Sequence, residues 1–131
     1  MPTAEQHYQV TLEDVLEAHD LALANGGGRA GIVRLEALLG AIGRPYHGYH
    51  ETLAEKAAAL LHSIATCHAF ADGNKRTSWL AVILLVERSA HDLVLRPGES
   101  ADDVPVDLIE GRLSQDGLVD WFRGRLVPRR R

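Results

Sequence analysis

A ten-residue polar run, His68–Thr77, lies between two segments that have the composition of buried helices. The segment before it, residues 52–67, has the apolar spacing of an amphipathic helix, with one face formed by Leu53, Ala57, Leu60, Leu61 and Ile64. The segment after it contains Trp79–Val86, which is apolar on every side and predicts a central, buried helix. This order requires a helix–loop–helix unit built around the polar run.

Most of the remaining chain also predicts helix. Thr11 with Asp14 forms a weak capping box at the start of a first helix, and the glycines at 26–28 end it. Further helices are expected over 32–42, 106–113 and 115–126, with a loop or short hairpin at 44–51 and a candidate short strand at 91–95. The expected fold class is therefore all-α, a compact single-domain bundle of about six helices. The domain is expected to span 1–127, and residues 128–131 form a basic tail.

Composition limits the functions that this chain can have. A formal charge of −4 over 131 residues argues against broad nucleic-acid binding, but it leaves local phosphate recognition open. The single Cys67 cannot form an intramolecular disulfide, which fits a reducing cytosol. The longest apolar run is too short to span a membrane, and the N-terminus does not resemble a signal peptide. We expect a soluble cytoplasmic protein with no direct contact with nucleic acid or membrane.

The polar run places two cations at the start of the second helix, where positive charge is unfavourable. Because the helix macrodipole is positive at this end, Lys75 and Arg76 should each destabilise the helix by about 0.3–1 kcal/mol. A bound anion would relieve this destabilisation. Gly73 permits a tight turn, so that the free backbone N–H groups around Asn74 can face a phosphate. The sequence therefore predicts a phosphate-binding helix start.

Two residues of the run have both a structural and a chemical interpretation. His68 continues the apolar stripe of the preceding helix and is compatible with a hydrogen-bonded core histidine. An imidazole, with an ordinary pKa of about 6.5, also suits a general base that deprotonates a hydroxyl. Asp72 precedes a glycine, as turn and N-cap residues do, but a carboxylate is also a ligand for Mg²⁺.

Other phosphate chemistries fit the spacing less well. The run lacks the preceding glycine and the Gly-Lys-Ser/Thr order of a P-loop. The His19-Asp20 and His91-Asp92 pairs are compatible with a helical metal phosphohydrolase. The first pair, however, lies on a helix with no second histidine placed to share its metal, and the second lies in an expected loop. His62 lies opposite the apolar stripe and is expected to be solvated, and His47 and His50 are expected to be exposed in a loop.

The motif His68-x-Phe70-x-Asp72-Gly73-Asn74-Lys75-Arg76 resembles the signature of Fic/Doc proteins, specifically of the Doc (death-on-curing) toxin branch. Residues 16–20, residues 34–44 and the compact length are also similar to Doc, so that the resemblance covers most of the chain. It implies the Fic/Doc type of helical bundle, with a small flap. Fic adenylyltransferases have glycine where this chain has Lys75 and a second arginine where it has Trp79. Doc proteins share the lysine.

The resemblance therefore implies a toxin of a toxin–antitoxin system. Such a toxin binds ATP in the reversed sense and transfers the γ-phosphate to a hydroxyl of a translation factor, elongation factor Tu in the family, arresting translation. Two alternatives remain: a Fic-type transferase of AMP or another nucleoside monophosphate, and a catalytically silent module that docks a partner or senses a nucleotide.

The resemblance also implies a role for each motif residue. His68 would be the catalytic base, Asp72 would hold Mg²⁺, and Lys75 and Arg76 would steady the phosphates of ATP. Asn74, with the backbone of Gly73 and Lys75, would form the anion hole. The target-docking flap would comprise Arg44, Pro45, Tyr46, His47, Gly48 and Tyr49.

Inhibition is expected to come from a partner. The inhibitory helix of many Fic proteins reads Ser/Thr-x-x-x-Glu-Gly/Asn, but Val106 precedes Glu110-Gly111 where the hydroxyl residue should be. The resemblance to Doc then implies a small antitoxin protein that acts in trans.

Overall fold

The computed structural model describes residues 7–46 and 50–129. Its elements, in chain order, are α1 (Leu12–Gly26), α2 (Leu35–Gly43), a 3₁₀ turn η2 (Arg44–Tyr46), α3 (Leu53–Cys67), α4 (Asn74–Arg88), β1 (His91–Leu93), α5 (Asp103–Ile109), α6 (Gln115–Arg123) and β2 (Leu126–Pro128). The all-α bundle of about six helices is confirmed. Within the described residues, every helix is too short or too polar to cross a lipid bilayer.

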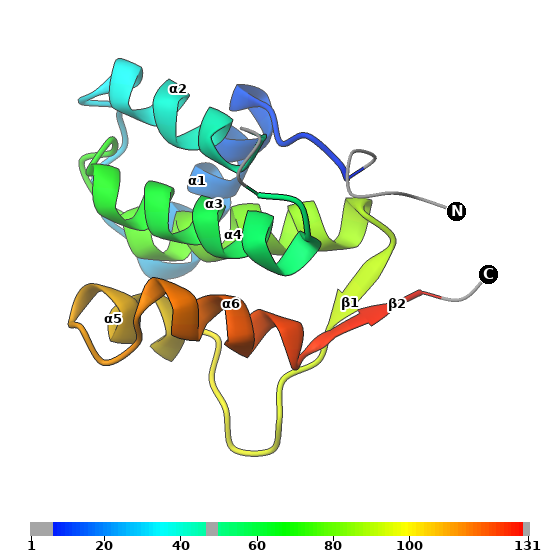
Figure 1. The fold of residues 1–131 in the computed structure, drawn as a ribbon. Coiled ribbons are helices and arrows are strands. Elements are labelled where there is room, and N and C mark those ends of the chain that lie inside the picture. Colours follow the sequence, from blue (N-terminus) through cyan, green and yellow to red (C-terminus); the bar gives the residue numbers. More distant parts are fainter. Residues whose placement is uncertain (1–6, 47–49, 130–131) are drawn as a thin grey trace.

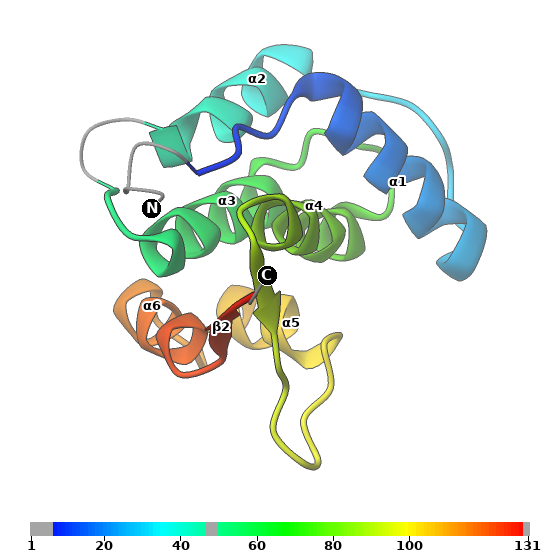
Figure 2. The ribbon, with the colours of Figure 1, turned by 90° about the vertical axis from the view of Figure 1, so that its right-hand side faces the viewer.

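The helices form three layers, which Figures 1 and 2 show from two sides. α3 and α4 lie side by side in the middle layer, with α1 and α2 above them and α5 and α6 below. β1 and β2 form a small antiparallel ribbon at one end of the bundle. The turn between α3 and α4, which contains the polar motif, lies at the opposite end.

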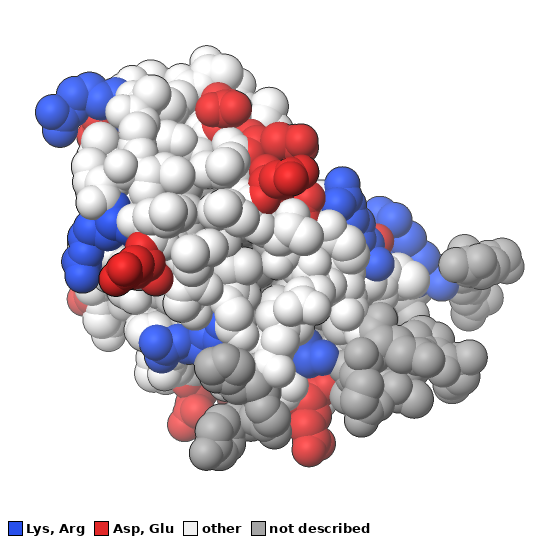
Figure 3. All heavy atoms as spheres, turned by 90° about the horizontal axis from the view of Figure 1, so that it is seen from above, with Lys and Arg blue, Asp and Glu red and all other residues white. Residues whose placement is uncertain are grey.

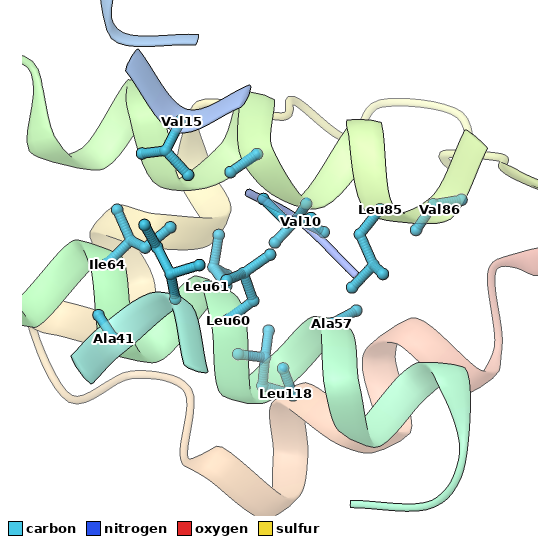
Figure 4. Packing of buried hydrophobic residues seen from close by; sticks show 14 of the residues in the cluster. Val10, Val15, Ala41, Ala57, Leu60, Leu61, Ile64, Leu85, Val86 and Leu118 are labelled. Carbon is cyan, nitrogen blue, oxygen red and sulfur yellow. The ribbon is translucent and has the colours of Figure 1, made fainter. Parts of the chain in front are cut away.

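The hydrophobic core is centred on α3. Leu60, Leu61 and Ile64 are fully buried and meet Val15 of α1, Leu85 of α4 and Leu118 of α6 (Figure 4). Much of the remaining surface of α3 is alanine, which lets neighbouring helices approach closely on several sides. The helix starts as predicted, because Thr52 and Glu55 form a reciprocal capping box. The capping box of Thr11 and Asp14 at α1 is also present.

The prediction that α4 is the central buried helix was wrong. Trp79, Leu80, Ile83 and Leu84 are only half-buried, whereas Ala81, Val82, Leu85 and Val86 face the core. α4 belongs to the middle layer, but its outer face is covered only in part. The alanine-rich α3 is enclosed instead, because small side chains allow α2, α4 and α6 to pack around it.

α2 begins three residues later than the helix predicted over 32–42. Ile32 forms an isolated antiparallel bridge with Phe70, and the amides of Val33 and Arg34 both donate to Ala69 O, at 2.7 and 3.1 Å. These long-range hydrogen bonds keep residues 31–34 extended, although their own sequence favours helix. Tertiary contacts thus override local preference here.

The C-terminal elements also differ from the prediction. α5 starts at Asp103 rather than at 106, because Pro105 occupies its first turn, where no backbone N–H is needed. α6 ends at Arg123 rather than at 126, and the next residues form β2, which pairs with β1. β2 crosses the boundary placed between residues 127 and 128. The side chain of Arg129 then contacts Asp92, with Nε to Oδ1 at 2.8 Å.

A buried arginine ties the end of α6 to the long loop before α5. The Arg125 side chain is 8% exposed, donates two hydrogen bonds to the Glu99 carboxylate, and lies over the ring of Trp121. These hydrogen bonds from Arg125, together with one from the Arg96 amide, lower the pKa of Glu99 to about 2.

This lowered pKa predicts a pH-dependent contribution to stability. The stabilisation from ionised Glu99 should be fully present above its ordinary pKa of 4.5 and should be lost as the pH falls toward 2. Glu99→Gln should therefore lower the melting temperature at neutral pH, and the difference from the parent should shrink between pH 4.5 and 2. Thermal unfolding of both proteins across this range measures it, with the exposed Glu17→Gln as control. A difference that does not change with pH would contradict the assignment.

Candidate functional site

The polar motif lines a cavity of about 780 Å³. Six predicted site residues contribute to it together: His68, Asp72, Gly73, Asn74, Lys75 and Arg76. The opposite walls come from the glycines at the end of α1 and from α5, through Gly26, Gly27, Gly28, Pro105, Val106 and Ile109. Residues from four helices thus enclose one space large enough for a nucleotide-sized ligand.

His68 ends α3 in an unusual backbone conformation. Its φ and ψ of 52° and 42° are left-handed, so that the chain turns out of the helix at this residue. His68 is exposed, which contradicts the interpretation of a core histidine. Its side chain lines the cavity and has no hydrogen-bond partner among the described residues. The ring is therefore available to a ligand.

The extended part of the motif is held from both sides. Ala69 and Ala71 exchange backbone hydrogen bonds with residues 31–34, and Asn74 closes the turn. The Asn74 side chain accepts from the Phe70 amide and donates to the Phe70 carbonyl, both at 3.0 Å. Its amide group is thus used within the loop. The donors left for an anion are the backbone N–H groups at the start of α4, where Thr77 is the first to reach a helical carbonyl.

His19 of α1 supports the motif loop, a role that the sequence pattern does not predict. It is 4% exposed, its ring stacks on Phe70 with centroids 3.9 Å apart, and Nε2 donates to Asp72 O at 2.8 Å. The ring therefore fixes the loop through both stacking and a hydrogen bond. This role replaces the metal-binding role considered for the His19-Asp20 pair.

The Asp72 carboxylate faces Arg29. It accepts a hydrogen bond from the Arg29 amide at 2.7 Å, which lowers the pKa of Asp72, and its other contact is with Arg29 Nε at 3.4 Å. Among the described residues, no group of three His, Cys, Asp or Glu side chains is placed to hold a metal ion. A single ionised carboxylate fits Mg²⁺ that takes its other ligands from phosphates and water.

The two cations at the start of α4 differ in their surroundings. Both are exposed and line the cavity, and neither forms an ion pair with a described residue. Arg76 lies against the end of α1, since a Cβ at Gly26 would come within 1.8 Å of its Nη1. Gly26 therefore leaves the space that the Arg76 guanidinium fills.

The glycine run at 26–28 has a second function besides ending α1. Gly28 has φ of +113°, and a Cβ there would come within 2.8 Å of the Asp72 Cβ. The close approach of two backbones at the motif thus requires glycine. The three consecutive glycines are visible in the sequence, but their contact with Asp72 is not.

The described residues of the proposed flap, 44–46, do not line this cavity. Residues 44–46 form the η2 turn, and Tyr46 OH bonds to Val10 N at 2.7 Å and to Tyr8 O at 2.9 Å. Burial raises the pKa of Tyr46 to about 12. His47, Gly48 and Tyr49 lie outside the described residues. Of the flap residues, Arg44 lines a separate hollow beside α3.

The histidine predicted to be solvated is half-buried. His62 contributes to the same hollow as Arg44, and burial is the main cause that lowers its pKa. The hollow exists because α2 presents small residues toward this face of α3, which the spacing of α3 alone does not show.

Comparison with known proteins identifies the family. The model of the Fic/DOC family matches residues 9–86, which is more than half of the chain, and the chain belongs to the Fic/Doc family. It is also similar to Toxin Doc of Mycolicibacterium smegmatis, at 43% identity over 74 residues. That match covers 53% of this chain and 55% of the relative, so that the chain spans about half the length of this relative. The resemblance to the Doc branch is confirmed.

Removal of the His19 ring should loosen the motif loop. His19→Ala loses a buried stacking contact and leaves Asp72 O without its donor, and we expect it to lower the free energy of unfolding by about 1–3 kcal/mol. Chemical denaturation measures this loss. The exposed neighbour Asp20→Ala should change stability by less than about 0.5 kcal/mol. Equal effects of the two variants would contradict the supporting role of His19.

Proposed function

We propose that this chain is the toxin of a toxin–antitoxin system, a phosphotransferase that moves the γ-phosphate of ATP to a Ser or Thr hydroxyl of a translation factor. Elongation factor Tu is the substrate to test first. The observation that carries the proposal is the shared cavity of His68, Asp72 and the start of α4, with Lys75 where adenylyltransferases have glycine.

His68 performs the proton transfer in this proposal. Its ring accepts the proton of the target hydroxyl while the hydroxyl oxygen attacks the γ-phosphorus. The bond from this phosphorus to the bridging oxygen breaks, and ADP leaves with that oxygen. The exposed imidazole has no competing partner among the described residues, which suits this role.

The start of α4 holds the phosphates. Free backbone N–H groups and the positive helix end bind the anion, and Lys75 and Arg76 supply full charges beside them. Bound Mg²⁺, held by Asp72, would neutralise further phosphate charge. Asn74 supports this site by fixing the loop through Phe70 rather than by direct contact with the ligand.

Transfer of AMP is the second candidate. Adenylyltransferases of the family place an arginine where Trp79 lines this cavity, and they leave the Lys75 position without a side chain. Both differences disfavour the AMP-transferring orientation of ATP. A silent binding module is the third candidate, and it is disfavoured because every residue of the chemical motif is present.

An antitoxin partner would need apolar surface for docking. Large exposed hydrophobic side chains lie on α1, on α2 and between them: Leu21, Ile32, Val33, Leu35 and Leu39. The face over α2 also has a broad area without charged residues, bordered by both acidic and basic side chains (Figure 3). This surface and the name of the toxin relative support a partner that acts in trans.

Incubation of elongation factor Tu with this protein, ATP and Mg²⁺ should add one phosphate, measured by intact-mass spectrometry. His68→Asn should abolish the gain while it retains folding and ATP binding. Asparagine suits this position better than alanine because it tolerates the left-handed backbone. A gain of AMP would instead establish the second candidate.

Expression in bacteria provides the cellular control. The parent protein alone should arrest growth, and His68→Asn should not. A variant as toxic as the parent would contradict the catalytic role of His68. Harmless expression of the parent would contradict the need for an antitoxin.

Lys75→Ala separates phosphate binding from structure. It should weaken ATP binding while it leaves the stability of the free protein unchanged or raised by up to about 1 kcal/mol, because a cation leaves the positive helix end. Calorimetric titration and chemical denaturation measure the two effects. Arg123→Ala, in an exposed ion pair on α6, should leave ATP binding unchanged. A stability loss above about 2 kcal/mol would make Lys75 a structural residue.

A further inference from the structure

A second hollow of about 470 Å³ lies between α2 and α3. Arg34 and Arg44 approach it from the two ends of α2, where they are the residues just before and just after the helix. α3 contributes polar side chains, and α2 contributes small residues between its arginines. These lining residues are His62, Ser63, Thr66 and Cys67 from α3 and Ala37, Gly40 and Ala41 from α2.

Two buried polar atoms in this hollow lack partners. Ser63 is 5% exposed, and its Oγ has no hydrogen-bond partner among the described residues. His62 Nδ1 is also buried and has no hydrogen-bond partner among the described residues. Buried polar groups are normally satisfied, and leaving one unpaired costs about 1–3 kcal/mol. Both residues line the same hollow, so that a bound group is one way to supply the missing partners.

The charge of the lining is of one sign. Arg34 and Arg44 are the charged residues of this lining, and no Asp or Glu among the described residues contributes to it. The pKa of His62 is lowered by burial and, to a smaller extent, by the Arg44 charge. An anion between His62 and Arg44 would offset the effect of the Arg44 charge. The hollow therefore favours a negatively charged occupant.

We propose that this hollow binds a phosphate group. Two guanidinium forks, a serine hydroxyl and an imidazole offer more donors than the two oxygens of a carboxylate can accept, and a phosphate group has more acceptor oxygens to offer them. None of these residues belongs to the motif cavity, so the site is separate from the one assigned to ATP. Its existence does not depend on the proposed phosphotransfer.

The hollow is linked to the motif through Arg34. Its amide donates to Ala69 O at 3.1 Å, and its Nη1 lies 3.5 Å from Cys67 O. These two carbonyls flank His68 in the sequence. A phosphate group held by Arg34 would therefore be connected, through this arginine, to the backbone on both sides of the proposed catalytic base.

Nuclear magnetic resonance of the histidine rings tests this site with inorganic phosphate as the probe. The titration uses the Lys75→Ala/Arg76→Ala double variant, in which phosphate binding at the start of α4 is weakened by the loss of both cations. We expect the His62 ring resonances to move to saturation. A further Arg44→Gln change should weaken this binding at least about tenfold, whereas the control Arg123→Gln should leave it unchanged.

Unmoved His62 resonances, or equal affinity with and without Arg44, would overturn the proposal. Acetate binding as tightly as phosphate would overturn the assignment to a phosphate group. Blocked phosphoserine serves as a second probe: tighter binding than inorganic phosphate identifies a phosphorylated side chain as the source, and weaker binding identifies a free anion. Failure of phosphotransfer to elongation factor Tu would leave all these results unaffected.

Discussion

Residues 31–34 lie in extended form against residues 69–71, and three backbone hydrogen bonds join the two segments. The motif loop depends on this pairing, because the segment between α3 and α4 belongs to no helix and these hydrogen bonds fix its backbone. His19 adds a second support through Phe70 and the Asp72 carbonyl. Together they orient His68 and the start of α4 toward one cavity.

This support explains why the candidate site uses so few buried charges. The supporting contacts are backbone hydrogen bonds, one aromatic stack and the Asn74 amide, all of which are satisfied within the protein. The charged groups, Lys75 and Arg76, remain exposed on the cavity. Apart from the contact between Asp72 and Arg29, the loop is thus ordered by neutral interactions, and its cations line the cavity.

The sequence predicted those parts of the molecule that local patterns determine. Both capping boxes, the helix–motif–helix unit and the family follow from residues close together in the chain. The late start of α2 and the pairing of β2 were not predictable in this way, because each depends on a distant partner. The same limit applies to His19 and Gly28, whose contacts with Asp72 join residues far apart in sequence.

Gly26 leaves space for the Arg76 guanidinium, and this placement also affects the electrostatics of the cavity. α1 has no basic residue in its own last turn, and the Arg76 guanidinium lies beside its final residue. Arg76 thus stands between the positive end of α4 and the negative end of α1, where the two partial charges act on it in opposite directions. An incoming phosphate must compete with the α1 terminus for this side chain, so that the affinity of the cavity for its ligand is set partly by a helix that ends well before the motif in the sequence.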